Sequence, residues 1–230
     1  MVSVAVIIPV KARDPKSRLA SVLNVKQRRQ LLVAMLEDVL QALMKARLIH
    51  STRVVSSDQE ILKFAQRYGA EGVEERENRG VNAAVRAGMY ETRQFGASLI
   101  IPADIPFLDA KDIRNVITLY GLGASVVVSP SEALDGTNLL LIKRATPFEL
   151  HYDDDSFRKH TKEAIERGIP VSMYYSQSVA FDIDTSRDLY RVFKMPRRCS
   201  TMTFLGRVMG KTRVKQSMQR DDNSRPRREL

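Results

Sequence analysis

Short apolar runs alternate with longer amphipathic stretches over the first half of the chain. The apolar runs are expected to be strands, at residues 3–9, 53–55, 72–75 and 98–101. Between them, apolar side chains recur at helical spacing, and the expected helices are 26–47, 59–68, 80–94 and 112–120. Strands that alternate with helices in this way are typical of a mostly parallel sheet with helices on its faces. The pattern therefore predicts an α/β fold.

After Gly123 the alternation gives way to a predicted hairpin. Two strand-like runs, 124–129 and 137–142, flank the turn signal Asp135-Gly136. Beyond the hairpin, the expected elements are a helix at 156–167, strands at 171–175 and 179–181, and a last helix at 185–193. The sheet is therefore predicted to be mixed, although mostly parallel.

Composition and charge predict one domain with an appendage. Hydrophobic residues make up 43% of the 230-residue chain, which suits a single sizeable core. Ten basic and three acidic residues lie between Pro196 and Leu230, so this segment carries most of the net charge of +10. We expect a domain at 1–195 and a basic, poorly ordered tail at 196–230.

The sequence also favours a cytoplasmic protein. No apolar run reaches the roughly 18 residues of a membrane span, and no signal peptide is evident at the first strand. The one cysteine, Cys199, excludes an internal disulfide and a multi-cysteine zinc site. We therefore expect a protein of the reducing cytoplasm with no membrane partner.

A carboxylate follows the expected strand at 98–101, in the sequence Ile101-Pro102-Ala103-Asp104-Ile105-Pro106. Ligands of open α/β sheets bind outside the carboxyl ends of the strands, and the two prolines restrict the backbone that carries Asp104. The residue is thus placed to hold a divalent cation close to phosphate groups. The alternative is a structural role, in which Asp104 caps the helix expected near Asp109.

Asp182 and Asp184 form a second carboxylate signal. Side chains two positions apart on a strand point to the same side, so both could share a metal site with Asp104. Magnesium commonly takes one or two carboxylates together with phosphate oxygens, so Mg²⁺ is the expected ion. Asp184 could instead cap the helix expected from Thr185.

The first strand leads into a loop that contains four cations, Lys11, Arg13, Lys16 and Arg18. The charges of Lys11, Lys16 and Arg18 could offset those of a triphosphate, and the alternative, which the spacing alone favours, is a solvated basic loop. The loop lacks the glycine patterns of the Walker loop and of the dinucleotide-binding fold, which argues against P-loop nucleotidases and nicotinamide-dependent oxidoreductases.

Five further residues are candidates for substrate contacts. Ser57 follows the second strand, and Gly80 and Asn82 open a helix, where backbone N–H groups bind anions and an amide can contact a base or ribose. Thr137 and Ser156 offer hydroxyl groups that could hold a small phosphorylated acid. The structural alternatives are helix capping at Ser57 and an ordinary glycine entry into the helix at Gly80.

The helix expected from Ser156 begins with a hydroxyl, two cations and the imidazole of His160, which together with the turn before Thr137 could hold a small phosphorylated acid. His50, His151 and His160 lie far apart in the sequence without the spacing of a zinc site, so a surface or capping role is the alternative for each. The carboxylates at 153–155 would repel an anionic substrate unless they turn outward or bind a metal ion.

The candidate segments follow one another in a specific order: Pro-Val-Lys with Lys-Ser-Arg-Leu, Gly-Val-Asn-Ala-Ala, Pro-Ala-Asp-Ile-Pro, Gly-Thr-Asn, Ser-Phe-x-x-His and Phe-Asp-Ile-Asp-Thr. In this order the chain, from about Val2 to Phe193, resembles the 2-phospho-L-lactate guanylyltransferases of coenzyme F-420 biosynthesis. The resemblance implies a glycosyltransferase-A-like (nucleotide-diphospho-sugar transferase-like) three-layer fold. It implies that GTP and 2-phospho-L-lactate form lactyl-2-diphospho-5'-guanosine and pyrophosphate, and that the protein is a homodimer.

By this similarity, Asp104, Asp182 and Asp184 would be the magnesium ligands, and Thr137 and Ser156 would bind the phosphorylated acid. The residues fit such chemistry. The second pKa of a phosphate monoester is near ~6, so the attacking oxygen is already charged at neutral pH and needs no general base. The reaction instead needs charge neutralisation and in-line positioning at the α-phosphorus.

Three other functions remain open from the sequence. The first is the same reaction on phosphoenolpyruvate or 3-phosphoglycerate. The second is a sugar-phosphate nucleotidyltransferase or a nucleotide-sugar glycosyltransferase of the same fold. The third is nucleic-acid binding through the basic tail, which is disfavoured because the body of the chain has no RNP-like aromatic motif and no zinc finger.

Overall fold

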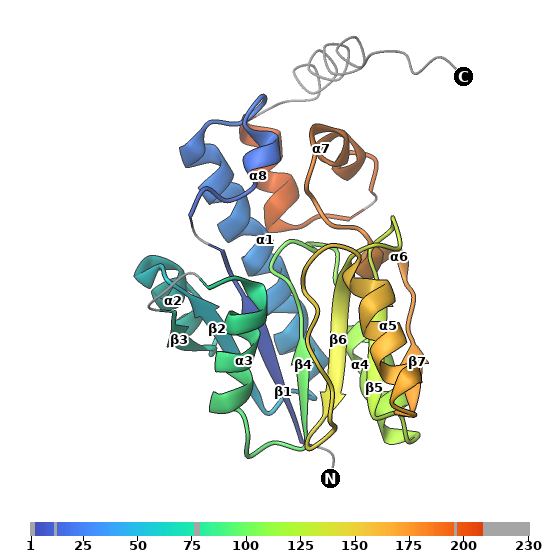
Figure 1. Cartoon of the computed structure of the whole chain (residues 1–230). Helices are drawn as coiled ribbons and strands as arrows, with labels where there is room; N and C mark the ends of the chain where they lie inside the picture. Colours follow the sequence, from blue (N-terminus) through green and yellow to red (C-terminus); the bar gives the residue numbers. More distant parts are fainter. Residues whose placement is uncertain (1–2, 12, 76–78, 196, 209–230) are drawn as a thin grey trace, which may run out of the picture.

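The computed structural model describes residues 3–11, 13–75, 79–195 and 197–208. Within these ranges, seven strands form one sheet in the order β3-β2-β1-β4-β6-β5-β7 (Figure 1). The strands are β1 (Val4–Pro9), β2 (Ser51–Ser56), β3 (Glu71–Glu74), β4 (Ala97–Ile100), β5 (Val126–Pro130), β6 (Thr137–Lys143) and β7 (Val171–Met173). The helices are α1 (Val25–Ala46), α2 (Gln59–Gln66), α3 (Val81–Glu91), α4 (Ala110–Gly121), α5 (Ser156–Glu166), α6 (Gln177–Ala180), α7 (Ser186–Val192) and α8 (Ser200–Val208).

The sheet is mixed and mostly parallel, as the sequence predicted. β1 is parallel to β2 and β4, β2 is parallel to β3, and β5 is parallel to β7. β6 is antiparallel to both of its neighbours, β4 and β5, because the chain returns from β5 through the hairpin turn at Gly136. The amino end of β6 therefore lies at the same edge of the sheet as the carboxyl ends of the parallel strands.

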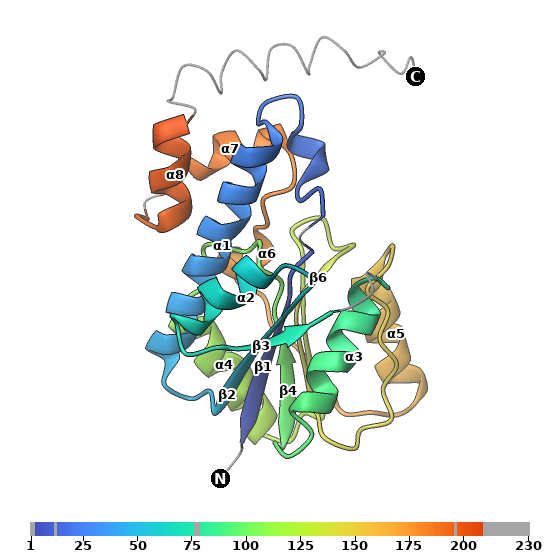
Figure 2. The same cartoon turned by 90° about the vertical axis from the view of Figure 1, so that its left-hand side faces the viewer.

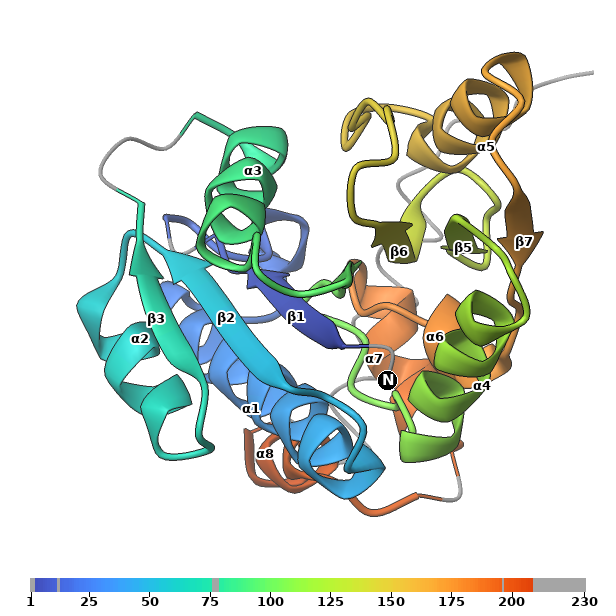
Figure 3. The ribbon, with the colours of Figure 1, turned by 90° about the horizontal axis from the view of Figure 1, so that it is seen from below.

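Helices cover both faces of the sheet, which gives three layers (Figure 3). α1, α2 and α4 pack on one face, where Val6 and Ile8 of β1 point. α3 and α5 pack on the other face, where Ile7 and Ile100 point. Strands buried on both faces read as continuous apolar runs, which is why β1 and β4 were evident in the sequence.

The longest helix, α1, has 22 residues and a well-defined start. The N–H of Gln27 donates to Asn24 Oδ1 at 2.9 Å, and the N–H of Asn24 donates to Gln27 Oε1 at 3.0 Å, which completes a capping box. None of the helices described here, α1 included, is both long enough and apolar enough to cross a membrane.

The first part of the segment predicted to be a poorly ordered tail is a helix of the folded core. α8 packs against α1 (Figure 2), with Leu205 buried. The carboxylate of Asp38, on α1, accepts the N–H groups of Ser200 and Thr201 at 2.8 and 2.9 Å and so caps α8. The folded domain therefore continues past the predicted boundary at residue 195. The local sequence does not show this, because the cap of α8 comes from Asp38 on a distant helix. Residues 209–230, which hold seven of the tail's ten basic residues, lie outside the described residues.

The strand expected at 179–181 is also different in the structure. Residues Gln177–Ala180 form the short helix α6, capped by Ser176, whose Oγ accepts the N–H of Val179 at 3.3 Å. Asn138 Nδ2 donates to the carbonyl oxygens of Val179 and Ala180 at 2.9 and 3.1 Å, which fixes this turn against β6. A side chain from another element thus overrides the strand propensity of the local sequence.

Gly88, in α3, tests how closely this helix packs on β1 and β2. A Cβ at this position would lie 2.5 Å from Ile7 Cγ2 and 3.2 Å from Val55 Cγ2. We expect Gly88→Ala to lower the free energy of unfolding by about 1–3 kcal/mol, because buried strand side chains must move. Urea denaturation measures this change.

The matched control is Gly121→Ala, at the last residue of α4, where an added Cβ meets no atom within 4 Å. This change should leave the stability unchanged or raise it by about 0.5 kcal/mol, since alanine restricts the unfolded chain. Equal effects of the two substitutions would contradict the close packing of α3.

Candidate active site

A cleft with a volume of about 810 Å³ opens at the carboxyl edge of the parallel strands. Its walls come from the loop after β1, the start of α3, the loop after β4, the start of β6, the start of α5 and the segment at 182–184. The cleft thus lies where the sequence predicted a site. It contains nine of the eleven predicted site residues: Lys11, Lys16, Arg18, Gly80, Asp104, Thr137, Ser156, Asp182 and Asp184.

The centre of the cleft is an ion-pair cluster. Lys16 Nζ lies 2.6 Å from Asp104 Oδ2 and 2.6 Å from Asp184 Oδ1. Arg18 Nη1 is 3.6 Å from the other oxygen of Asp184, but the Arg18 side chain is largely exposed. Burial alone would lower the pKa of Lys16, yet the charges of Asp104 and Asp184 outweigh burial and hold this pKa above its usual value.

Asp182 is the third carboxylate of the cluster. Burial and the nearby charges of Asp104 and Asp184 raise its pKa to about 6. The cluster therefore has more negative charge than Lys16 neutralises, which favours binding of a further cation. Carboxylate oxygens are the donor type of hard divalent cations, so by donor type Asp104, Asp182 and Asp184 suit such an ion, while Lys16 Nζ contacts two of the three.

A backbone hydrogen bond brings the segments of the carboxylates together, and other residues cap the neighbouring helices. The N–H of Ile183 donates to the carbonyl oxygen of Asp104 at 3.2 Å, which ties the two segments to each other. The neighbouring helices have other caps: Asp109 caps α4, and Thr185 begins α7 in a capping box with Asp188. The capping alternatives considered for Asp104 and Asp184 are therefore not realised, and both side chains face the cleft.

The basic loop is held in an unusual conformation by α1. The buried guanidinium of Arg28 pairs with Asp14, and its Nε donates to the carbonyl oxygen of Pro15 at 3.1 Å. Lys16 has φ 52°, a left-handed conformation that costs a residue with a side chain about 1–2 kcal/mol. The Arg28 contacts and the two carboxylate partners of Lys16 compensate for this strain. Lys11 lies exposed on the wall of the cleft.

Of the three residues predicted to bind the nucleotide, one lines the cleft and two do not. Gly80, with φ 90°, begins α3 and lines the cleft. Ser57 and Asn82 are not among the residues that line it. Asn82 Oδ1 accepts the N–H of Tyr152 at 2.9 Å, so this side chain joins α3 to the loop before α5. Contacts of Ser57 and Asn82 with a nucleotide stay predictions.

On the opposite side of the cleft, Thr137 and Ser156 form a hydroxyl pair backed by His160. The N–H of Thr137 donates to Ser156 Oγ at 2.9 Å, and Ser156 Oγ donates to Thr137 Oγ1 at 3.2 Å. His160 Nε2 accepts the N–H of His151 at 2.9 Å, so the ring proton is on Nδ1, which donates to Thr137 Oγ1 at 2.9 Å. Thr137 Oγ1 accepts both of these protons, which leaves its own hydroxyl proton for a ligand.

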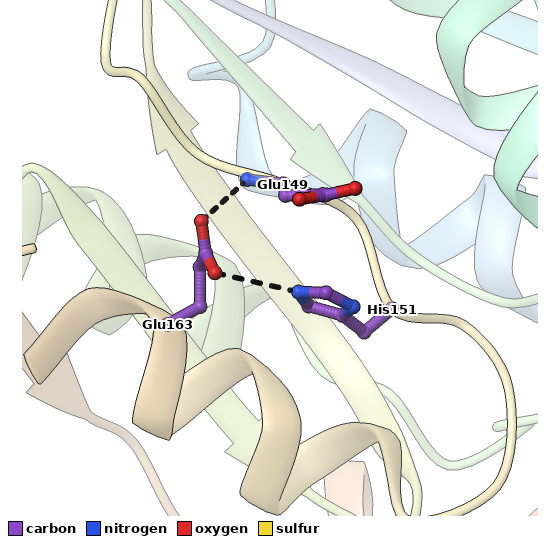
Figure 4. A group of neighbouring side chains, drawn as sticks. All are labelled: Glu149, His151 and Glu163. Atoms are coloured by element: carbon purple, nitrogen blue, oxygen red, sulfur yellow. Dashed lines mark hydrogen bonds and ion pairs between the residues drawn. The ribbon is translucent and has the colours of Figure 1, made fainter. Parts of the chain in front are cut away.

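A second cluster braces the loop that joins these residues. Glu163 accepts the N–H of Glu149 at 3.2 Å, and its other oxygen lies 3.5 Å from His151 Nε2 (Figure 4). Glu163 also pairs with Arg167. The side chains of Glu149, His151 and Glu163 are close enough to share a metal ion. The contacts of Glu163 with the Glu149 N–H and with His151 support the loop whose His151 N–H binds His160.

The acidic stretch at 153–155 is largely paired with cations of α5. Asp153 lies 3.0 Å from Lys159 Nζ, and this hydrogen bond lowers the pKa of Asp153. Asp155 Oδ1 lies 3.7 Å from Arg158 Nε. These pairs reduce the repulsion that was expected between this stretch and an anionic substrate.

The family model described as "Guanylyl transferase CofC like" matches residues 4–225. The chain belongs to this family. It is 37% identical, over 87% of its length and 89% of the relative, to the 2-phospho-L-lactate guanylyltransferase of Methanocaldococcus vulcanius. It is 36% identical, over 83% of its length and 93% of the relative, to the phosphoenolpyruvate guanylyltransferase of Rubrobacter xylanophilus.

Solved structures confirm the nucleotide-diphospho-sugar transferase-like fold. A structure from Desulfovibrio desulfuricans described as such a transferase superposes with a TM-score of 0.73 at 16% identity, covering 94% of this chain and 98% of that one. A cytidylyltransferase from Leptospira borgpetersenii superposes with a TM-score of 0.58 at 11% identity, covering 100% and 99%. The family and this fold together identify the protein as a nucleotidyltransferase.

Three residues of the cleft region were not among the predicted site residues. His160, for which a surface or capping role was the alternative, is fully buried behind Thr137. Tyr152 and Glu75 line the cleft, and each has an enclosed oxygen without a hydrogen-bond partner among the described residues. The only sequence signal for His160 was its place in Ser-Phe-x-x-His, four residues after Ser156 and so on the same face of a helix.

The buried histidine makes stability depend on pH. Burial, and secondarily the charge of His151, lowers the pKa of His160 from 6.5 to about 4. Between these values the unfolded chain binds a proton at this position that the folded chain does not, so stability falls as the pH falls. The full effect is about 3 kcal/mol.

We therefore expect His160→Gln to be most destabilising at neutral pH and less so as the pH falls toward about 5. Urea denaturation of the wild type and the variant across this range measures the difference in unfolding free energy. The contribution of Asp182, which has the opposite sign, is common to both proteins and cancels. A difference that stays constant with pH would contradict the neutral, buried state of His160.

Proposed function

We propose that this protein joins GTP to 2-phospho-L-lactate, forming lactyl-2-diphospho-5'-guanosine and pyrophosphate, with Mg²⁺ bound by Asp104, Asp182 and Asp184. The observation that carries the proposal is the carboxylate cluster between two differently built halves of the cleft. The half beside β1 and α3 offers cations and a helix N-terminus. The half beside β6 and α5 offers hydroxyl groups.

The two halves suit the two substrates. Lys11 and Arg18 are exposed cations on the first half, and Gly80 opens α3, so a triphosphate finds both charge and backbone donors there. Thr137 has a hydroxyl proton to donate on the second half, which suits the carboxylate or phosphate of a small acid. The nucleotide therefore binds beside β1 and the acceptor beside β6, with the carboxylates between them.

The reaction forms one phosphorus–oxygen bond and breaks another. A phosphate oxygen of the acceptor attacks the α-phosphorus of GTP, and the bond from this phosphorus to the oxygen that bridges to the β-phosphate breaks, releasing pyrophosphate. When bound, magnesium supplies positive charge to the attacking and leaving oxygens. Lys11, Lys16 and Arg18 stabilise the charge that gathers on pyrophosphate, and Thr137 orients the acceptor.

Lys16 has a further role in this proposal. Its ammonium group holds Asp104 and Asp184 at a fixed separation before substrates bind. This arrangement keeps the carboxylates in place despite their mutual repulsion, which lowers the reorganisation needed on binding.

The acceptor has one serious competitor. Phosphoenolpyruvate is supported by the relative from Rubrobacter xylanophilus, whose identity to this chain is within one percentage point of that of the phospholactate enzyme. Pyrophosphate release from GTP and Mg²⁺, with 2-phospho-L-lactate, phosphoenolpyruvate or no acceptor, distinguishes the two. Release that requires phospholactate supports the proposal, and release that requires phosphoenolpyruvate assigns the second reaction. No release with either would overturn both.

Further features of the proposal follow the family resemblance. We expect a homodimer located in the cytoplasm, and light scattering of the purified protein measures the first of these. Nucleic acid is not an expected partner. The basic residues that would favour it lie mostly at 209–230, outside the described residues.

Asp104→Asn tests the metal assignment. The amide keeps the size of the side chain but loses the charge that pairs with Lys16 and would bind Mg²⁺. We expect magnesium-dependent pyrophosphate release to fall by at least about 100-fold, while the fold survives. The matched change Asp154→Asn, at an exposed carboxylate of the loop before α5, should leave turnover within about two-fold. Full activity of Asp104→Asn would refute the assignment.

A further inference from the structure

Glu75 directly follows β3, at the end of the cleft farthest along the sheet from Thr137. Its N–H donates to the carbonyl oxygen of Ser56 at 3.0 Å, which fixes its backbone to the end of β2. The side chain lines the cleft together with Val10, Gly80 and Val81. The nucleotide half of the proposed site therefore ends in a carboxylate.

One oxygen of this carboxylate lacks a partner. Glu75 Oε1 is enclosed and accepts no hydrogen bond from the residues that the structure describes. Buried polar oxygens are nearly always hydrogen-bonded, and an unpaired carboxylate oxygen is especially costly. A donor brought by a ligand in the cleft would complete the site.

The order of the sheet indicates which part of the ligand lies there. β3 is at one end of the sheet, β1 and β4 are inside it, and β6 follows β4. The proposed reaction places the α-phosphorus at the carboxylate cluster, after β1 and β4, and the acceptor beside β6. The base, at the opposite end of the nucleotide from the reacting phosphates, then points toward β3 and Glu75. Val81, which is 38% exposed, gives an apolar surface for the base to pack on.

We propose that Glu75 selects guanine by accepting hydrogen bonds from the N1–H and the 2-amino group of the base. This inference rests on the proposed function, because it assumes a nucleotide in this half of the cleft. The two guanine donors are adjacent and match the two oxygens of a carboxylate. Rotation of the carboxylate about its last bond, which is a soft torsion, turns Oε1 toward the base.

The other bases fit this carboxylate less well. Adenine presents its N1 as an acceptor beside the 6-amino group, so one carboxylate oxygen would face a lone pair. Cytosine has the same defect at N3, and uracil offers one donor between two carbonyl oxygens. A buried group left unpaired by the wrong substrate discriminates strongly against it.

Glu75→Gln is expected to change which base the site accepts. A purely structural role of Glu75 would not change base preference. The amide keeps an acceptor for N1–H but places a donor against the 2-amino group of guanine. Xanthine has a carbonyl oxygen at this position, which accepts that donor. We expect kcat/KM for GTP to fall about 10- to 100-fold and kcat/KM for XTP to rise, measured by pyrophosphate release with the active acceptor.

The matched control is Glu74→Gln, the same chemical change at the exposed neighbouring residue, which should leave the ratio of GTP to XTP use unchanged. Equilibrium titration of GTP and XTP without acceptor repeats the comparison for binding alone. It separates this inference from the proposed reaction, because base selection is then seen even if no acceptor is turned over. An unchanged ratio in Glu75→Gln, or an equal loss with both nucleotides, would overturn the assignment.

Discussion

Three carboxylates in one cleft repel one another, and the construction of the site follows from how this repulsion is balanced. Lys16 bridges Asp104 and Asp184, while Asp182 takes up protons more readily than an isolated aspartate. The lysine reaches this position from a left-handed backbone conformation, which Arg28 supports from the first turns of α1. Through Arg28, α1 therefore helps to position a charged residue of the cleft, although α1 itself contributes little to the cleft wall.

The carboxylates could be predicted from the sequence because their position depends on local signals. Asp104 lies in the loop that follows the buried strand β4, where the edge-of-sheet rule places ligand sites. Asp182 and Asp184 are two positions apart and both line the cleft, although they follow α6 and not the strand expected at 179–181. His160, Glu75 and the cap of α8 depend instead on contacts between distant segments. The Asp38 carboxylate binds backbone groups 162 and 163 residues away, and no local pattern encodes such a pairing. The same reason explains why α6 was taken for a strand.

The two halves of the cleft are physically linked. Asn82 is the second residue of α3, and its side-chain oxygen accepts the N–H of Tyr152, 70 residues further along the chain. The preceding residue, His151, donates its N–H to His160 Nε2. His160 therefore donates from Nδ1 to Thr137 Oγ1, which leaves the hydroxyl proton of Thr137 for a ligand. A short run of backbone, 151–152, thus connects the proposed nucleotide half with the proposed acceptor half through three hydrogen bonds.

The reversed strand β6 has an evolutionary consequence. The proposed nucleotide half is built from parallel strands, each of which is separated from the next by a whole helix, so a change there disturbs much of the fold. Thr137, the proposed acceptor contact, stands instead at the first position of a hairpin strand, after a turn that can change length or sequence locally. If Thr137 contacts the acceptor as proposed, acceptor preference can diverge among relatives while the guanylyl chemistry is retained, which agrees with the different acceptors in the names of two relatives that are 37% and 36% identical to this chain.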